Sequence, residues 1–152
     1  MSISCDGAYK GKSQKATAGI IVRNHKRELV GGKVITVPPV SSFLSEAVAV
    51  KEACLVSISI ELVTTTIEND NAKVKLQRGR APWEIVVIIG DIKQDAIDHA
   101  LNFVQIPRTL NKPAYWIASE FLKQSLPIGW VSSPPRDFCV LLQADCNQSI
   151  IS

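Results

Sequence analysis

Three carboxylates of this 152-residue chain stand where they could bind metal ions together. Asp6 lies in the middle of an expected strand, in CDGAY, although aspartate is a poor strand former. Glu46 lies in the first turns of an expected helix, and Asp70 follows an expected strand. Such a cluster repels itself unless divalent cations neutralise it, and hard oxygen ligands suit Mg²⁺. Two such ions could clamp the attacking water and the leaving oxygen of a phosphodiester.

Each of these carboxylates also has a purely structural interpretation. Asp6 could be a turn or capping acid, Glu46 a solvated helix residue, and Asp70 the N-cap of a following helix. The apolar neighbours of Glu46 favour an inward-facing side chain and therefore the metal hypothesis. Glu68, two residues before Asp70, is expected on the same strand face, close behind the cluster.

The first part of the chain has the pattern of three antiparallel strands. β-Branched and apolar residues predict strands over 2–10, 16–23 and 28–37, joined by short polar turns. Gly31 and Gly32 inside the third segment indicate a bulge or a close packing contact. Successive strands with short turns form a meander.

Helical and strand patterns then alternate. Apolar spacing predicts a helix over 41–62, residue preferences predict a strand over 62–68, and a short basic helix is expected over 69–80. The run at 82–96 fits a strand by residue preference and a helix by its spacing, and periodicity alone leaves both open.

The last part of the chain predicts one more strand and one more helix. The strand is expected over 100–108 and the helix over 112–126, with Asn111 as its cap. The proline-containing tail after it is expected to be extended, ending in a short apolar turn. This order of elements predicts an α/β fold with a mixed sheet and helices on both faces.

Length and composition predict a single domain over 1–152, with a core of about 2–128 and a C-terminal wrap over 129–152. The net charge of +3 permits an anionic partner such as nucleic acid. No apolar stretch reaches membrane-spanning length, and nothing in the pattern points to oligomerisation. Scattered cysteines indicate an intracellular protein with reduced thiols, in nucleus or cytoplasm, with a Cys139–Cys146 bridge as the minor alternative.

Six segments, in this order, resemble the ribonuclease H-like domain of many plant proteins and plant retroelements. They are CDGAY, AGIIVRN, SEAVAVKEA, IENDNAKV, GDI and PRTLNKPAYWIA, and the closing LPIGWVSSPPRDFCVLLQADC also fits the family. Each motif alone is weak, but six in order at matching spacing are specific. The resemblance implies a ribonuclease H-like fold with a mixed five-stranded sheet, and it favours a helix over 83–95.

The resemblance also implies a function. Active members of the family hydrolyse the RNA strand of an RNA–DNA hybrid with two Mg²⁺ ions, which implies that Asp6, Glu46 and Asp70 are the catalytic residues and metal ligands here, with Mg²⁺ or Mn²⁺ as cofactor. Gly7 and Ala8 would leave room for the nucleic-acid backbone.

One position departs from the family. A fully acidic site has a fourth carboxylate in the last helix of the pattern R-x-x-N-x-x-A-D, and here that position is Tyr115, which we expect to be a packing residue. A neutral phenol does not replace a carboxylate as a ligand at neutral pH. An RNA–DNA hybrid ribonuclease, either fully active or weakened by this departure, is therefore the first hypothesis. The alternatives are a catalytically inactive nucleic-acid-binding module and a retroelement-derived relic.

Basic residues near the acids are candidates for contact with the phosphates of a hybrid or of RNA, although a charge run is more often a solvated face. The candidates are Lys10, Lys12, Lys15, Lys73, Lys75, Arg78 and Arg80.

Overall fold

A computed structural model describes residues 1–11, 15–37, 42–59, 65–70, 90–95, 98–99 and 101–151 of the chain. The strands are β1 (Ser2–Lys10), β2 (Lys15–Arg23), β3 (Leu29–Val37), β4 (Thr65–Asn69) and β5 (Leu101–Gln105). The helices are α1 (Ser42–Ser59), α4 (Lys112–Leu122) and α5 (Arg136–Ile151), with a 3₁₀ turn η1 (Arg108–Leu110) before α4. Residues 90–95 are helical too.

The five strands form one mixed sheet in the order β3-β2-β1-β4-β5. β1, β2 and β3 pair antiparallel, as their short connections require, whereas β4 pairs parallel with both β1 and β5. The meander and the mixed five-stranded sheet are thus confirmed. The expected bulge is present as well, because Val22 faces Gly31 while Arg23 faces Leu29.

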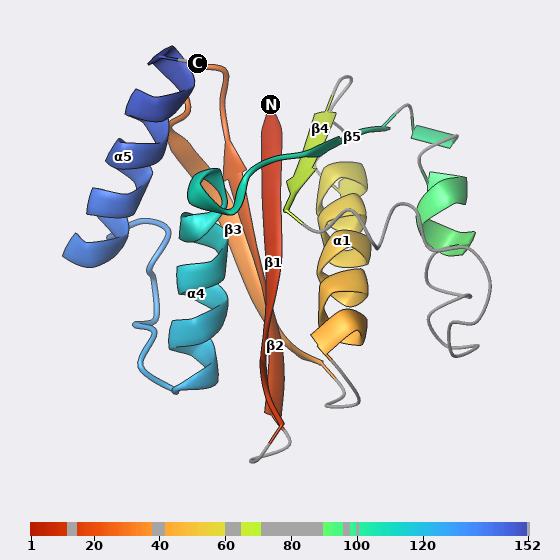
Figure 1. Ribbon diagram of the computed structural model, residues 1–152, viewed down its shortest axis with the longest axis horizontal. Helices are drawn as coiled ribbons and strands as arrows, with labels where there is room; N and C mark the ends of the chain where they lie inside the picture. The colour runs from red at the N-terminus through yellow and green to blue at the C-terminus, as the bar shows by residue number, and fades with distance from the viewer. Residues whose placement is uncertain are drawn as a thin grey trace.

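Helices cover both faces of the sheet, with α1 on one side and α4 and α5 on the other (Figure 1). The α1 side of the core combines apolar side chains of β1, β2 and β4 with small residues of the helix, such as Ala47, Ala53 and Cys54. These small side chains let α1 approach β1 closely, which brings the start of the helix to the middle of that strand.

α4 packs against the opposite face through a glycine contact. A Cβ atom on Gly19 of β2 would lie 2.8 Å from the carbonyl oxygen of Ala114 and 3.3 Å from the Cβ of Ala118. The hydroxyl of Thr17 donates a hydrogen bond of 2.7 Å to the Ala118 carbonyl. Ala8 of β1 is buried against Ala118, so its small size serves the packing of α4.

The C-terminal tail differs from its expected extended form, because residues 136–151 form α5. The prolines that suggested an extended chain lie before this helix, where Pro134 and Pro135 are compatible with a helix start. α5 packs through Phe138, whose ring stacks on Trp116 at 5.6 Å and meets Trp130 edge-on at 5.8 Å.

Other expectations have mixed outcomes. The helical alternative for 83–95 is confirmed over 90–95, whereas 83–89 and the short helix at 69–80 lie outside the described residues. The thiol of Cys139 is free, so the bridge to Cys146 is not formed. No helix in the described ranges is long and apolar enough to cross a membrane.

Candidate metal centre

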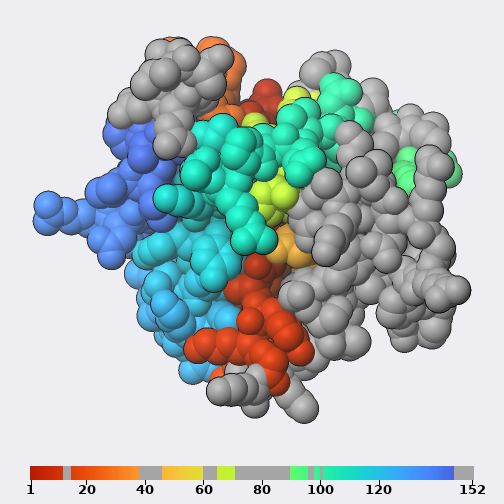
Figure 2. All heavy atoms as spheres, viewed as in Figure 1, coloured from red at the N-terminus to blue at the C-terminus, as the bar shows by residue number. Residues whose placement is uncertain are grey.

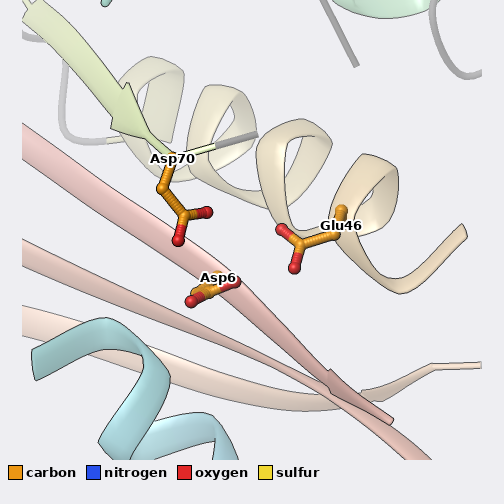
Figure 3. Close-up of side chains that lie close together, drawn as sticks. All are labelled: Asp6, Glu46 and Asp70. Carbon is orange, nitrogen blue, oxygen red and sulfur yellow. The ribbon is translucent and has the colours of Figure 1, made fainter. Parts of the chain in front are cut away.

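The side chains of Asp6, Glu46 and Asp70 meet at one point of the structure (Figure 3). Each offers a carboxylate oxygen, and these oxygens all lie within 4.8 Å of one another. The register of the parallel pair explains part of this meeting, because Ser4 faces Glu68 and the two aspartates stand two residues further along. Glu46 reaches the same point from α1, which lies on the same side of β1 as the strand leading to Asp70 in the view of Figure 3.

Few groups among the described residues donate hydrogen bonds to the oxygens of the three carboxylates. Oδ1 of Asp6 accepts a hydrogen bond of 2.8 Å from the backbone N–H of Gly7. Oε2 of Glu46 is buried and has no hydrogen-bond partner among the described residues. An orphaned carboxylate oxygen beside two further carboxylates is the arrangement that a cation would complete.

Burial dominates the electrostatics of the cluster. Loss of solvent raises the pKa of Asp6 to about 10, and the nearby charges of Glu46 and Asp70 add to the effect. Burial raises the pKa of Glu46 and that of Asp70 as well, although the positive charge of Arg108 opposes the rise at Asp70. Three such carboxylates resist simultaneous ionisation in the absence of a cation, so the donor set fits a divalent metal ion.

Two amide side chains hold β1 next to Asp6. Nδ2 of Asn69 and Nδ2 of Asn111 donate hydrogen bonds of 2.9 and 3.1 Å to the same carbonyl, that of Cys5. Asn111 is the N-cap residue of α4, as expected, but its side chain makes no capping hydrogen bond. Both asparagines stood in the quoted motifs IENDNAKV and PRTLNKPAYWIA, but only the structure shows their common acceptor.

Glu68 lies in a different set of contacts from the one expected. Its Oε1 accepts a hydrogen bond of 2.9 Å from Arg27, which also donates to Asp145 on α5 at 3.0 Å. Arg23, which is fully buried, binds the same carboxylate of Asp145 and donates to the hydroxyl of Ser4 at 2.8 Å. Sequence reasoning missed this ion-pair cluster, because its members come from four separate elements.

Three of the remaining candidates, Lys10, Lys15 and Tyr115, lie among the described residues. Lys10 is exposed at the end of β1, and Lys15 is exposed at the start of β2. Tyr115 lies in α4 with 53% of its surface exposed, so its expected packing role is wrong. The other basic candidates, Lys12, Lys73, Lys75, Arg78 and Arg80, lie outside the described residues.

The mixed sheet and its helices define the ribonuclease H-like fold class. Residues 4–121 match the sequence model described as reverse transcriptase-like, so the chain belongs to the reverse transcriptase-like family. This confirms the family resemblance, whereas a plant origin stays a prediction. No curated protein sequence matches the chain significantly.

Solved structures of ribonucleases H share the fold. The structure of RNase H1 from the halophilic archaeon Halobacterium salinarum NRC-1 superposes with a TM-score of 0.72 at 15% identity, covering 81% of this chain and 97% of that one. LC11-RNase H1, in complex with an RNA/DNA hybrid, gives 0.70 at 18% identity over 83% and 99% of the two chains. The N-terminal RNase H domain of rv2228c from Mycobacterium tuberculosis, solved as a fusion with maltose binding protein, gives 0.70 at 11% identity over 82% and 95%.

Proposed function

We propose that this protein is a divalent-metal-dependent ribonuclease that hydrolyses the RNA strand of an RNA–DNA hybrid. The observation that carries the proposal is the convergence of Asp6, Glu46 and Asp70, whose oxygens lie within 4.8 Å of one another on a ribonuclease H-like fold. The hybrid as substrate is supported by the similar LC11-RNase H1, whose structure contains an RNA/DNA hybrid.

In this proposal Asp6, Glu46 and Asp70 are the ligands of Mg²⁺ or Mn²⁺. The bound ions would supply an activated water and charge stabilisation at the leaving oxygen. The residues of the chain keep the ligands in place: the Gly7 N–H fixes one oxygen of Asp6, and the two asparagine amides fix the carbonyl just before it. Preorganised ligands avoid a reorganisation cost during the reaction.

Basic side chains would position the nucleic acid. Lys10 and Lys15 flank the hairpin that joins β1 to β2, and both are exposed. We include Lys12, Lys73, Lys75 and Arg78 in the same proposal on the strength of the sequence. Phosphate contacts of this kind make binding weaker at high salt. A hybrid would be recognised by its shape and its 2′-hydroxyls.

A second candidate function is binding of nucleic acid without cleavage, in an inactive or retroelement-derived module. Tyr115 favours it, because this exposed phenol stands where a fully acidic site has its fourth carboxylate. Fewer carboxylates would hold the metals less firmly and would stabilise less charge in the transition state.

A cleavage assay separates the two candidates. The purified protein is incubated with a hybrid labelled on its RNA strand, with Mg²⁺ or Mn²⁺, beside an Asp6→Asn variant and an Asp137→Asn control. Asp137 is an exposed carboxylate of α5. We expect metal-dependent cleavage that falls by more than about 100-fold in Asp6→Asn, since even residues behind the metal ligands contribute up to about that factor. Salt-sensitive binding without cleavage would support the second candidate, and the lack of both would refute each of them.

A further inference from the structure

A cleft runs along α4 and the end of β1. We call it the α4 cleft. Ala8 of β1 lines it, and Ala8 follows Asp6 by two residues, on the same face of the strand. The end of β1 (red) borders α4 in Figure 2, just below the point where β1, α1 and β4 reach the surface together. One wall of the cleft therefore lies two residues along β1 from a candidate metal ligand.

The lining of the α4 cleft is positively charged on balance. It includes three lysines, Lys10, Lys112 and Lys123, and one acid, Glu120. The Glu120 carboxylate lies 3.7 Å from the Nζ of Lys123, so that pair partly neutralises itself. With three lysines against one glutamate, the lining has more basic than acidic side chains, which suits a polyanion.

The same cleft presents one exposed aromatic ring. Tyr115 lines it with 53% of its surface exposed, so about half of this residue is open to a ligand in the cleft. The neighbouring Trp116 is stacked on Phe138 at 5.6 Å, which gives this part of the wall a rigid backing. The cleft has a volume of about 510 Å³, within the range of small-ligand sites.

We propose that the α4 cleft binds a single-stranded RNA segment that extends from the hybrid, with Tyr115 stacking on a base and Lys10 and Lys112 contacting phosphates. This inference rests on the proposed function, because it assigns a second part of the same substrate. Grooves that bind single strands combine lysine or arginine with exposed aromatic rings in this way. A duplex fits less well, because its bases are paired and stacked on one another and offer no free face to a tyrosine.

The test measures binding without cleavage, in the Asp6→Asn background. The probes are a blunt RNA–DNA hybrid, the same hybrid with a single-stranded RNA extension of about six nucleotides at either end, and the single-stranded RNA alone, a length within the ~4–16 nucleotides of known single-strand sites. Tyr115→Ala removes the ring, Tyr115→Phe keeps it, and Lys112→Ala removes one charge. Lys26→Ala, in the exposed turn between β2 and β3, is the matched lysine control.

We expect one of the two extensions to tighten binding about tenfold, the usual effect of one stacked base. Tyr115→Ala should abolish this gain and Tyr115→Phe should keep it, while Lys112→Ala, unlike Lys26→Ala, should reduce both the gain and its salt dependence. No gain from either extension, or a gain that survives Tyr115→Ala, would overturn the proposal. If the wild-type protein fails to cleave any hybrid, the proposed function fails, but the affinities of the Ala and Phe variants for single-stranded RNA still decide whether the cleft binds it.

Discussion

The guanidinium of Arg23 on β2 donates a hydrogen bond to the carboxylate of Asp145 on α5, and solvent reaches almost none of either side chain. Arg27 binds the same carboxylate and also Glu68 of β4. α5 is therefore tied to β2 by Arg23 and to β4, the strand just before Asp70, by Arg27 in the turn after β2. α5, which the sequence did not predict, therefore stabilises the part of the sheet that carries the candidate metal ligands.

Removing one partner of this buried pair should destabilise the protein strongly. Asp145→Ala leaves the charge of Arg23 buried without its carboxylate, and we expect a loss of about 3–5 kcal/mol in the free energy of unfolding. Urea denaturation measures it. Asp137→Asn, in the exposed first turn of the same helix, should cost less than about 1 kcal/mol. Equal losses in both variants would contradict a special role of the buried pair.

The free energy of unfolding should depend on pH, because ionising the buried carboxylates is costly. Burial holds the pKa of Asp6 at about 10, above its value in the unfolded chain, so the folded state binds a proton more tightly. The contribution of Asp6 is therefore fully present below about pH 4, and it is lost progressively as the pH rises through about 10. Asp6→Asn removes this effect.

We expect metal-free Asp6→Asn to be more stable than metal-free wild type at pH 8, because the variant has no carboxyl group whose burial becomes more costly as the pH rises. The difference should shrink toward pH 4. Chemical denaturation at a series of pH values in EDTA measures it, and a difference that stays constant with pH would show that Asp6 ionises freely.

Added metal should raise the free energy of unfolding, because it binds the folded protein and not the unfolded chain. At a concentration 100 times its dissociation constant, Mg²⁺ or Mn²⁺ should raise the stability by about 2.7 kcal/mol, which appears as a higher Tm. EDTA should reverse the shift. Glu46→Gln should reduce it, because the variant lacks one anionic ligand, whereas Glu52→Gln on the same helix should keep it. An identical shift in all three proteins would place metal binding elsewhere.

Restoring a carboxylate at the fourth position should increase cleavage of a blunt hybrid. Tyr115→Asp supplies the missing acid on α4, and one well-placed electrostatic group is worth about 10²–10³ in rate. Initial rates with Mg²⁺ and Mn²⁺ measure the effect, with Tyr115→Asn as the neutral control. An unchanged or lower rate in Tyr115→Asp would mean that α4 does not bring this position to the metals.

The contact between β2 and α4 should tolerate no larger residue. Gly19→Ala places a Cβ atom 2.8 Å from the Ala114 carbonyl, so α4 must move, at a cost of about 1–3 kcal/mol. Gly90→Ala is the matched control, because a Cβ there meets no atom of the described residues within 4 Å and the residue is helical. The control should be neutral or stabilising by up to about 1 kcal/mol. Thermal unfolding separates the two, and an equally stable Gly19→Ala would show that α4 packs less tightly.

Much of the fold follows from local patterns. The three strands of the meander, the helix that starts near Ser42 and the strands of residues 65–69 and 101–105 are visible in residue preferences and periodicity. Strand alternation also places Asp6 on a defined face. The grouping of Asp6, Glu46 and Asp70 came from the family motifs, whose order and spacing carry information that single segments lack.

The sequence by itself therefore determined the order of the described elements as far as α4, the mixed sheet and the three acids. Tertiary structure alone decided that residues 136–151 are helical, that Asn111 binds the carbonyl of Cys5, and that Glu68 pairs with Arg27. The reason is physical. Strand and helix preferences act between residues that are close in the sequence. A buried polar group, in contrast, needs a hydrogen-bond partner, and tertiary packing supplies that partner from a distant segment.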